Sequence, residues 1–99
     1  MWLNNFEEAI IGPFKTAIEE FKNDKWIFKI DDGVTLEVRL DGEYESDNGL
    51  DYEEDGYEEF FAMSFVVTKI IEDNANLYNE GDLIEINYHN IPISYKKVQ

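Results

Sequence analysis

The sequence predicts an α+β fold, in which an N-terminal helix packs on a four-stranded, mainly antiparallel sheet in the chain order α-β-β-β-β. Three observations predict it. Apolar residues recur every three or four positions near the N-terminus, they alternate with polar residues in later segments, and an Asp-Gly pair joins two of those segments. Because the chain has 99 residues, we expect residues 1–99 to form a single domain.

The helical part is predicted at about residues 5–23. Its apolar stripe, spaced by three and four positions, consists of Leu3, Phe6, Ile10, Phe14, Ile18 and Phe21. Asn5 followed by Glu8 resembles a capping box. Gly12-Pro13 interrupts the stripe, because proline lacks an amide hydrogen and disfavours helical dihedrals at the preceding residue. We therefore expect a kinked helix or two abutting helices, with the intervening charged residues in water.

Strands are predicted at about residues 25–31, 34–41, 59–71 and 82–90, where apolar and polar residues alternate. The first two form a hairpin, because Asp32-Gly33 supplies the positive φ that a tight turn requires. Trp26 lies in phase with its apolar neighbours and is predicted to be in the core, whereas Trp2 is left unassigned. Pro92 restricts the fourth strand to an edge, and residues 93–99 are interpreted as a tail.

The third predicted strand is apolar on both faces. One face carries Phe61, Met63, Phe65, Val67 and Ile71, and the other carries Phe60, Ala62, Val66 and Ile70. A single helix covers only one face of a sheet, so the second face needs another cover. That cover is the insert, the tail, sheet curvature or another subunit, and a homodimer through that face is one hypothesis.

Negative charge is concentrated in one segment. The chain has 8 Lys plus Arg against 23 Asp plus Glu, a formal net charge of -15. Residues 41–59 contain ten of the acids and no cation, whereas the remaining eighty residues carry a net charge of only -5. This segment is predicted as an acidic insert between the second and third strands. The overall charge disfavours direct binding of nucleic acid or of an anionic membrane surface.

The insert is the candidate partner-binding site. Three tyrosines are spread among its acids, and aromatic residues beside charges are typical of protein interfaces. The predicted partner-binding residues are Asp41, Glu43, Tyr44, Glu45, Asp47, Asp51, Tyr52, Glu53, Glu54, Asp55, Tyr57, Glu58 and Glu59. The expected partner is a basic protein.

No metal or cofactor site is predicted. With Gly56 at the sixth position of a calcium-binding loop, the twelfth position falls on Ala62, where a bidentate Glu is required. Only a weak, irregular calcium site stays open. The chain has no Cys, and its glycines form no phosphate-binding motif.

No catalytic motif is present, so the sequence predicts that the protein is not an enzyme. His89 is the only imidazole, and no nucleophile elbow surrounds Ser46, Ser64 or Ser94. We interpret His89 as a surface histidine of the fourth strand.

Three functions are compatible with these features. The leading hypothesis is an inhibitor that binds a basic nucleic-acid-binding protein by charge mimicry of nucleic acid, a size and charge profile shared with phage-encoded anti-defence and anti-CRISPR proteins. The alternative is an immunity protein that neutralises a cytotoxic enzyme. A third is a small structural domain with a flexible acidic loop. Without a signal peptide or a membrane span, the protein is expected in the cytoplasm.

Overall fold

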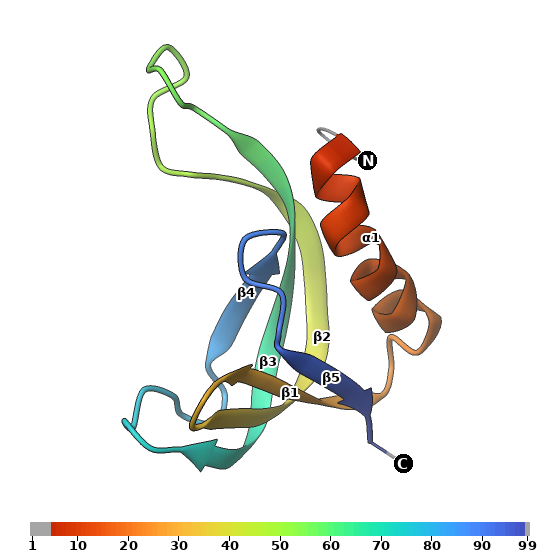
Figure 1. Cartoon of the computed structure of the whole chain (residues 1–99). Helices are drawn as coiled ribbons and strands as arrows, with labels where there is room; N and C mark the ends of the chain where they lie inside the picture. Colours follow the sequence, from red (N-terminus) through yellow and green to blue (C-terminus); the bar gives the residue numbers. More distant parts are fainter. Residues whose placement is uncertain (1–4, 99) are drawn as a thin grey trace.

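The computed structural model describes residues 5–98, and of Asn5 the backbone only. Within that part of the chain, helix α1 (Asn5–Glu20) is followed by strands β1 (Lys25–Asp31), β2 (Val34–Asp47), β3 (Glu59–Asp73), β4 (Leu83–Asn87) and β5 (Ser94–Lys97). The strands form one antiparallel sheet of order β4-β3-β2-β1-β5, and α1 lies beside it (Figure 1). The predicted α+β fold is confirmed, with one strand more than expected.

Helix α1 runs through Gly12 and Pro13 as a single element of 16 residues, so two abutting helices are excluded. Pro13 is exposed, which allows water to reach the carbonyl group that lacks a helical donor. The helix ends at Glu20, three residues earlier than predicted. The predictions for Trp2, for Leu3 and for capping by the Asn5 side chain lie outside the described residues. No helix within residues 5–98 has the length and apolar content needed to cross a bilayer.

The buried face of α1 differs from the predicted stripe. The side chains that face the sheet, each at most 1% exposed, are Glu7, Ile11, Phe14 and Ile18. In contrast, Phe6 is 66% exposed and Ile10 is 37% exposed. Positions 7, 11, 14 and 18 fit the helical period as well as positions 6, 10, 14 and 18 do. Because Glu7 is acidic, the apolar pattern of the sequence did not indicate that this face of α1 is the buried one.

Strands β1 and β2 form the predicted hairpin. Gly33 has a φ of 81°, as the Asp-Gly turn requires, and Trp26 pairs with Val38. Trp26 is 5% exposed, which confirms its place in the core. β2 continues to Asp47, beyond its predicted end, because residues 42–47 pair with residues 59–64 of β3. The first part of the predicted insert is therefore strand, since backbone ladders tolerate acidic side chains that reach water.

Strand β3 carries irregularities that change which side chains face the core. The pairing register with β2 shifts at three points, and one shift leaves Ile71 without a direct partner. Ile70 packs against the core, whereas Ile71 is 49% exposed, the reverse of the prediction. Sequence alternation cannot reveal such a shift, because each bulge exchanges the two faces.

The second apolar face of β3 is partly covered by the chain itself. Phe60 is 4% exposed, and its ring centroid lies 6.1 Å from that of Tyr88 and 5.4 Å from that of His89. Ala62 is fully buried. The turn after β4 therefore shields Phe60, one of the residues for which cover by the insert, the tail, sheet curvature or another subunit was expected. Whether the protein forms a homodimer stays a prediction.

The C-terminal segment, predicted as a tail, forms strand β5. Residues 94–97 pair with β1, and Ile93 N donates a further hydrogen bond to Lys29 O at 2.8 Å. Strand β4 is correspondingly shorter than predicted and ends at Asn87. The chain then crosses from one edge of the sheet to the other. Alternation over four residues is too short a signal to distinguish such a strand from a tail.

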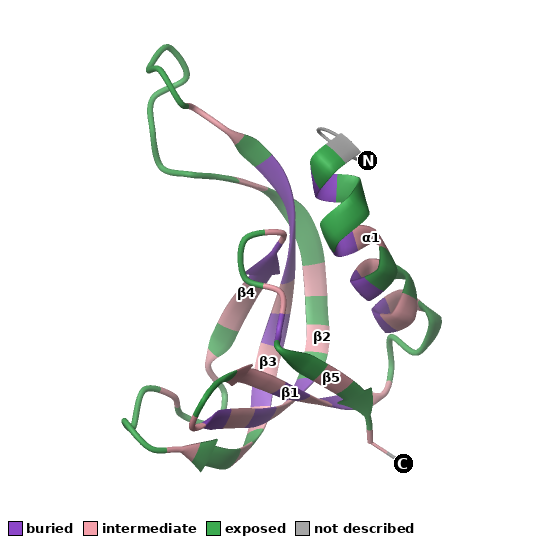
Figure 2. Ribbon diagram, viewed as in Figure 1, coloured by how far each residue is buried: buried purple, intermediate pink, exposed green. Residues whose placement is uncertain are grey.

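The core lies between α1 and the sheet. The rings of Phe14, Phe28 and Phe65 meet there, with centroids 4.8 to 6.1 Å apart. Figure 2 shows buried residues at intervals along α1 and along much of β3, while the connection between β2 and β3 is mostly exposed. The acidic segment thus extends away from the core.

Candidate functional site

Residues 41–59, here called the acidic ribbon, form a projecting two-stranded arm. β2 and β3 stay paired as far as Asp47 and Glu59, whereas β4 pairs with β3 only over residues 62–66. Figure 1 shows this arm extending beyond β4 to a loop at residues 48–58, here called the tip. The arm thus carries ten acids and no cation away from the body of the protein.

The tip is held by hydrogen bonds. Asn48 N donates to Glu58 O at 3.2 Å, and Asn48 Nδ2 donates to Gly56 O at 2.7 Å. Gly49 N donates to Asp47 Oδ1 at 2.8 Å. Gly56 has a φ of 84°, a conformation that glycine adopts without strain. These contacts give the loop a defined backbone on which side chains are displayed.

Two tyrosines are displayed on the tip. Tyr52 is 82% exposed, and its ring makes an edge contact with Tyr57, with centroids 5.7 Å apart. Tyr57 is half-buried, and burial together with the carboxylate of Glu59 raises the pKa of its hydroxyl group. Tyr52 therefore presents an aromatic face to solvent among carboxylates, while Tyr57 supports it.

Tyr44, by contrast, is used within the chain. Its hydroxyl donates to Glu85 Oε1 at 2.6 Å, which joins β2 to β4 across β3. Burial and this hydrogen bond raise the pKa of Tyr44 to about 12. Tyr44 thus strengthens the base of the ribbon.

Glu43 also makes contacts within the chain. Its carboxylate lies 3.7 Å from Lys15 Nζ on α1, and the same ammonium group lies 2.6 Å from Glu19. Burial and the neighbouring Glu19 raise the pKa of Glu43. Lys15 also stands 5.3 Å from the centroid of the Phe61 ring. One of the few cations therefore connects α1 to β2 within the ribbon and to β3 just beyond it.

Glu58 connects the tip to the turn after β4. The Tyr88 hydroxyl donates a hydrogen bond to Glu58 Oε2, and His89 Nε2 lies 2.8 Å from Glu58 Oε1. The hydrogen bond from Tyr88, with that of His89, lowers the pKa of Glu58 although burial opposes this. His89 is half exposed, in agreement with its interpretation as a surface histidine, but it lies in the turn after β4 rather than in the strand.

The other predicted site residues lie on the surface of the ribbon. Asp41 sits at a register shift of β2, where Ser64 Oγ approaches it at 3.5 Å, and Asp47 accepts the Gly49 hydrogen bond described above. The remaining six are exposed: Glu45, Asp51, Glu53, Glu54, Asp55 and Glu59. The structure thus divides the predicted site into residues that hold the ribbon and residues that are free to meet a partner.

Sequence reasoning missed Glu7, which is fully buried. Its Oε1 accepts a hydrogen bond from Phe61 N at 2.7 Å, just beyond the end of the β4 ladder. The signal was present, since Glu7 lies four residues before Ile11 and seven before Phe14 on one face of α1. An acid at such a position marks a polar contact within the core.

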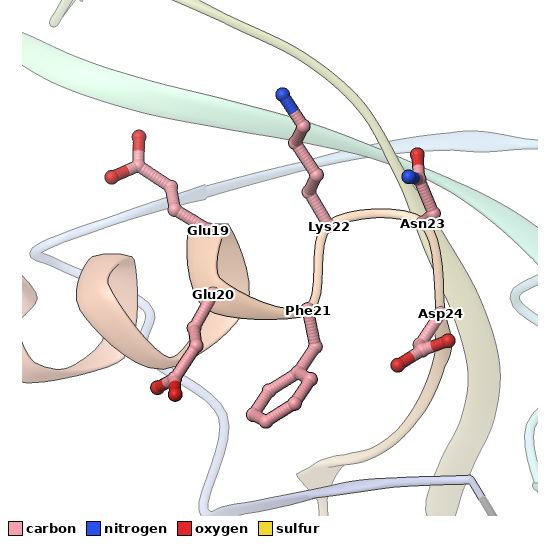
Figure 3. Close-up of a pocket in the computed structure, with 6 residues that line it drawn as sticks. All are labelled: Glu19, Glu20, Phe21, Lys22, Asn23 and Asp24. Atoms are coloured by element: carbon pink, nitrogen blue, oxygen red, sulfur yellow. The ribbon is translucent and has the colours of Figure 1, made fainter.

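The depression in Figure 3 lies at the other end of α1. It measures about 290 Å³ and is lined by residues 19–24, whose side chains diverge, with Phe21 and Lys22 pointing to opposite sides. Lys97 Nζ stacks 4.1 Å from the centroid of the Phe21 ring. Within the described residues, no group of three or more His, Asp and Glu side chains is arranged to hold a metal ion.

Comparison with protein families gives one match. A family described as "Cognate immunity protein YxxD" matches residues 10–97, which include the ribbon and every strand. No curated protein and no solved structure matches the chain. The match supports the alternative hypothesis, an immunity protein, and gives no support to the anti-CRISPR interpretation.

Proposed function

The chain belongs to the YxxD family of cognate immunity proteins, and from this premise we propose that it binds and neutralises one toxin protein through the acidic ribbon. A cognate immunity protein has a toxin as its partner. The finer features, which are a basic toxin surface, binding without catalysis and action in the cytoplasm, are part of the proposal.

The observation that carries the proposal is the projecting arm with its exposed aromatic residue. Ten acids on one arm create a negative field that speeds the approach of a basic partner. Tyr52 can then bury a large, rigid ring against that partner, and such anchors dominate binding energy at protein interfaces. The negative charge speeds association with the toxin, and the buried aromatic ring slows dissociation from it. Both properties suit an inhibitor of a toxic protein.

The residue order Tyr-x-x-Asp occurs twice in the ribbon. In the first copy Tyr44 binds Glu85 and Asp47 binds the backbone of Gly49. In the second copy Tyr52 and Asp55 are both exposed. We assign the first copy to holding the ribbon and the second to contact with the toxin.

The test uses the cognate toxin of this immunity protein. Tyr52→Ala should weaken binding of the toxin by roughly 30-fold and reduce protection of cells that express it. Leu77→Ala is the matched control, because Leu77 is also exposed, at 65%, but lies in the connection between β3 and β4. Wild-type affinity of Tyr52→Ala would refute the proposal.

Charge mimicry of nucleic acid remains a candidate mechanism by which this immunity protein binds its toxin. Glu43, Glu45 and Asp47 alternate along β2 and therefore share one face, with neighbours about 6.6 Å apart, although Lys15 offsets part of the charge of Glu43. If this row occupies a nucleic-acid site of the toxin, an oligonucleotide competes with the immunity protein and the affinity falls steeply with salt. If neither occurs, the toxin is held elsewhere and mimicry is excluded.

A further inference from the structure

The acidic ribbon has a structural weakness at its root. Beyond the β4 ladder, residues 59–61 of β3 are paired on one side with β2 only. A two-stranded arm of this kind is marginally stable by itself. Its direction relative to the body therefore depends on contacts other than the ladder.

The turn after β4 supplies such contacts at the place where β4 stops. Strand β4 ends at Asn87, and the next two residues, Tyr88 and His89, both bind the carboxylate of Glu58. Their rings also pack against Phe60, with the Tyr88 and His89 centroids 4.0 Å apart. These three residues, Glu58, Tyr88 and His89, are here called the brace.

We propose that Tyr88 and His89 are positioning residues of the toxin-binding site, which act through Glu58 to hold the acidic ribbon in its binding orientation. This inference rests on the proposed function. A positioning residue does not itself touch the toxin. Tyr88 is half-buried against the core and Phe60, whereas the proposed contact residue Tyr52 lies on the tip.

The chemistry of the brace suits a fixed joint. A hydrogen bond to a charged carboxylate is stronger than one between neutral groups. The brace is short in space but long in sequence, since Glu58 and Tyr88 are 30 residues apart. Glu7 on α1 adds a second attachment, because it accepts a hydrogen bond from Phe61 N. Both α1 and the turn after β4 therefore hold the start of β3 in place.

A held ribbon binds more tightly than a free one. Without the brace, the arm samples many orientations and must lose that freedom when it meets the toxin. The loss of one hydrogen bond to a carboxylate is expected to weaken toxin binding by roughly tenfold.

The test compares Tyr88→Phe with the wild-type protein. This substitution removes one hydroxyl group and keeps the ring that packs against Phe60. Amides of residues 48–61 should exchange with deuterium about tenfold faster in the free protein, and toxin affinity should fall by a similar factor. Tyr95→Phe is the matched control, because Tyr95 packs against Phe14 and Trp26 at β5 and should change neither value.

A second pair of variants keeps the test independent of folding defects. His89→Gln retains a side-chain N–H donor for Glu58 and should bind the toxin better than His89→Ala. A merely structural role for His89 would lower the thermal midpoint of both variants without a change in exchange confined to the ribbon.

The outcomes separate this inference from the proposed function. Wild-type exchange and affinity of Tyr88→Phe, together with weak binding of Tyr52→Ala, would overturn the brace and leave the proposed function intact. Faster deuterium exchange of Tyr88→Phe with unchanged toxin affinity would also overturn the inference. The brace would then hold the ribbon, but its orientation would not matter for toxin binding. Wild-type affinity of Tyr52→Ala would contradict the proposed function instead.

Discussion

The Tyr88 hydroxyl donates a hydrogen bond to Glu58, so the turn after β4 is joined to the last residue of the tip, directly before β3 begins. Glu58, which was predicted to bind a partner, therefore has a structural role. Lys15 with Glu43 and Tyr44 with Glu85 act in the same way. The root of the ribbon is therefore bound to α1, to β4 and to the turn beyond it, while the tip carries the residues that stay exposed.

The tyrosines at the ribbon root should ionise late. The hydrogen bond to Glu58, with burial, raises the pKa of Tyr88 to about 12, and burial with Glu85 does the same for Tyr44. The folded pKa exceeds the unfolded value of 10, so this stabilisation is complete below pH 10 and is lost as the pH rises towards 12. In a titration followed by tyrosinate absorbance, Tyr88→Phe and Tyr44→Phe should each remove one late-titrating group. Unchanged curves would contradict the two contacts.

Glu58 should make stability depend on acid pH. Its hydrogen bond from Tyr88 lowers its pKa from 4.5, so the stabilisation is present above pH 4.5 and is lost as the pH falls through the lowered pKa. The difference in unfolding free energy between the wild type and Glu58→Gln should be constant near neutral pH and shrink in acid. Glu53→Gln, at an exposed position, is the control for the loss of one negative charge.

Adjacent isoleucines on α1 should differ sharply in their effect on stability. Ile11 is fully buried, whereas Ile10 is 37% exposed. Ile11→Ala should therefore lower the free energy of unfolding by about 3 kcal/mol, because it leaves a cavity in the core. Ile10→Ala should cost less than about 1 kcal/mol. Urea denaturation of both variants measures the difference, and a larger loss at Ile10 would support the face that the sequence alone predicted.

The helix illustrates how far the sequence could be interpreted. Its existence and approximate span followed from the spacing of apolar residues, and Phe14 and Ile18 lie in the core as expected. The buried face predicted for the first half of the helix was wrong, because Phe6 and Ile10 are apolar and Glu7 is not. The tertiary contact between Glu7 and Phe61 N, which the sequence does not reveal, explains why an acid is buried there.

The sheet shows a similar division. Alternation and the Asp-Gly turn located the first hairpin, since both are local signals. The extension of β2 through an acid-rich segment and the pairing of β5 with β1 depend on partners distant in sequence. For the candidate site, composition identified the ribbon, but only the structure separates Tyr44 and Glu58, which hold it, from Tyr52, which is displayed.

Glu7 should contribute to stability through the hydrogen bond that it accepts from β3. Glu7→Ala removes the acceptor for the buried Phe61 N–H, which should cost about 2 kcal/mol of unfolding free energy. Glu7→Gln keeps an acceptor oxygen and should cost less. Glu8→Ala, one residue further along α1 and exposed, is the control and should be close to neutral. Equal losses for Glu7→Ala and Glu8→Ala in urea denaturation would argue against the contact.

Two glycines of β2 and its preceding turn should respond oppositely to alanine. Gly33 has a φ of 81°, and a Cβ there would lie 2.7 Å from Asn74 Nδ2. Gly33→Ala should therefore lower the free energy of unfolding by about 1 to 2 kcal/mol, from backbone strain and from displacement of Asn74. A Cβ on Gly42 would meet nothing within 4 Å, and Gly42 does not have a positive φ. Gly42→Ala should be neutral or stabilise the protein by up to about 1 kcal/mol, because it restricts the unfolded chain. Thermal or urea denaturation measures both, and a stabilising Gly33→Ala would contradict the turn geometry on which the first hairpin depends.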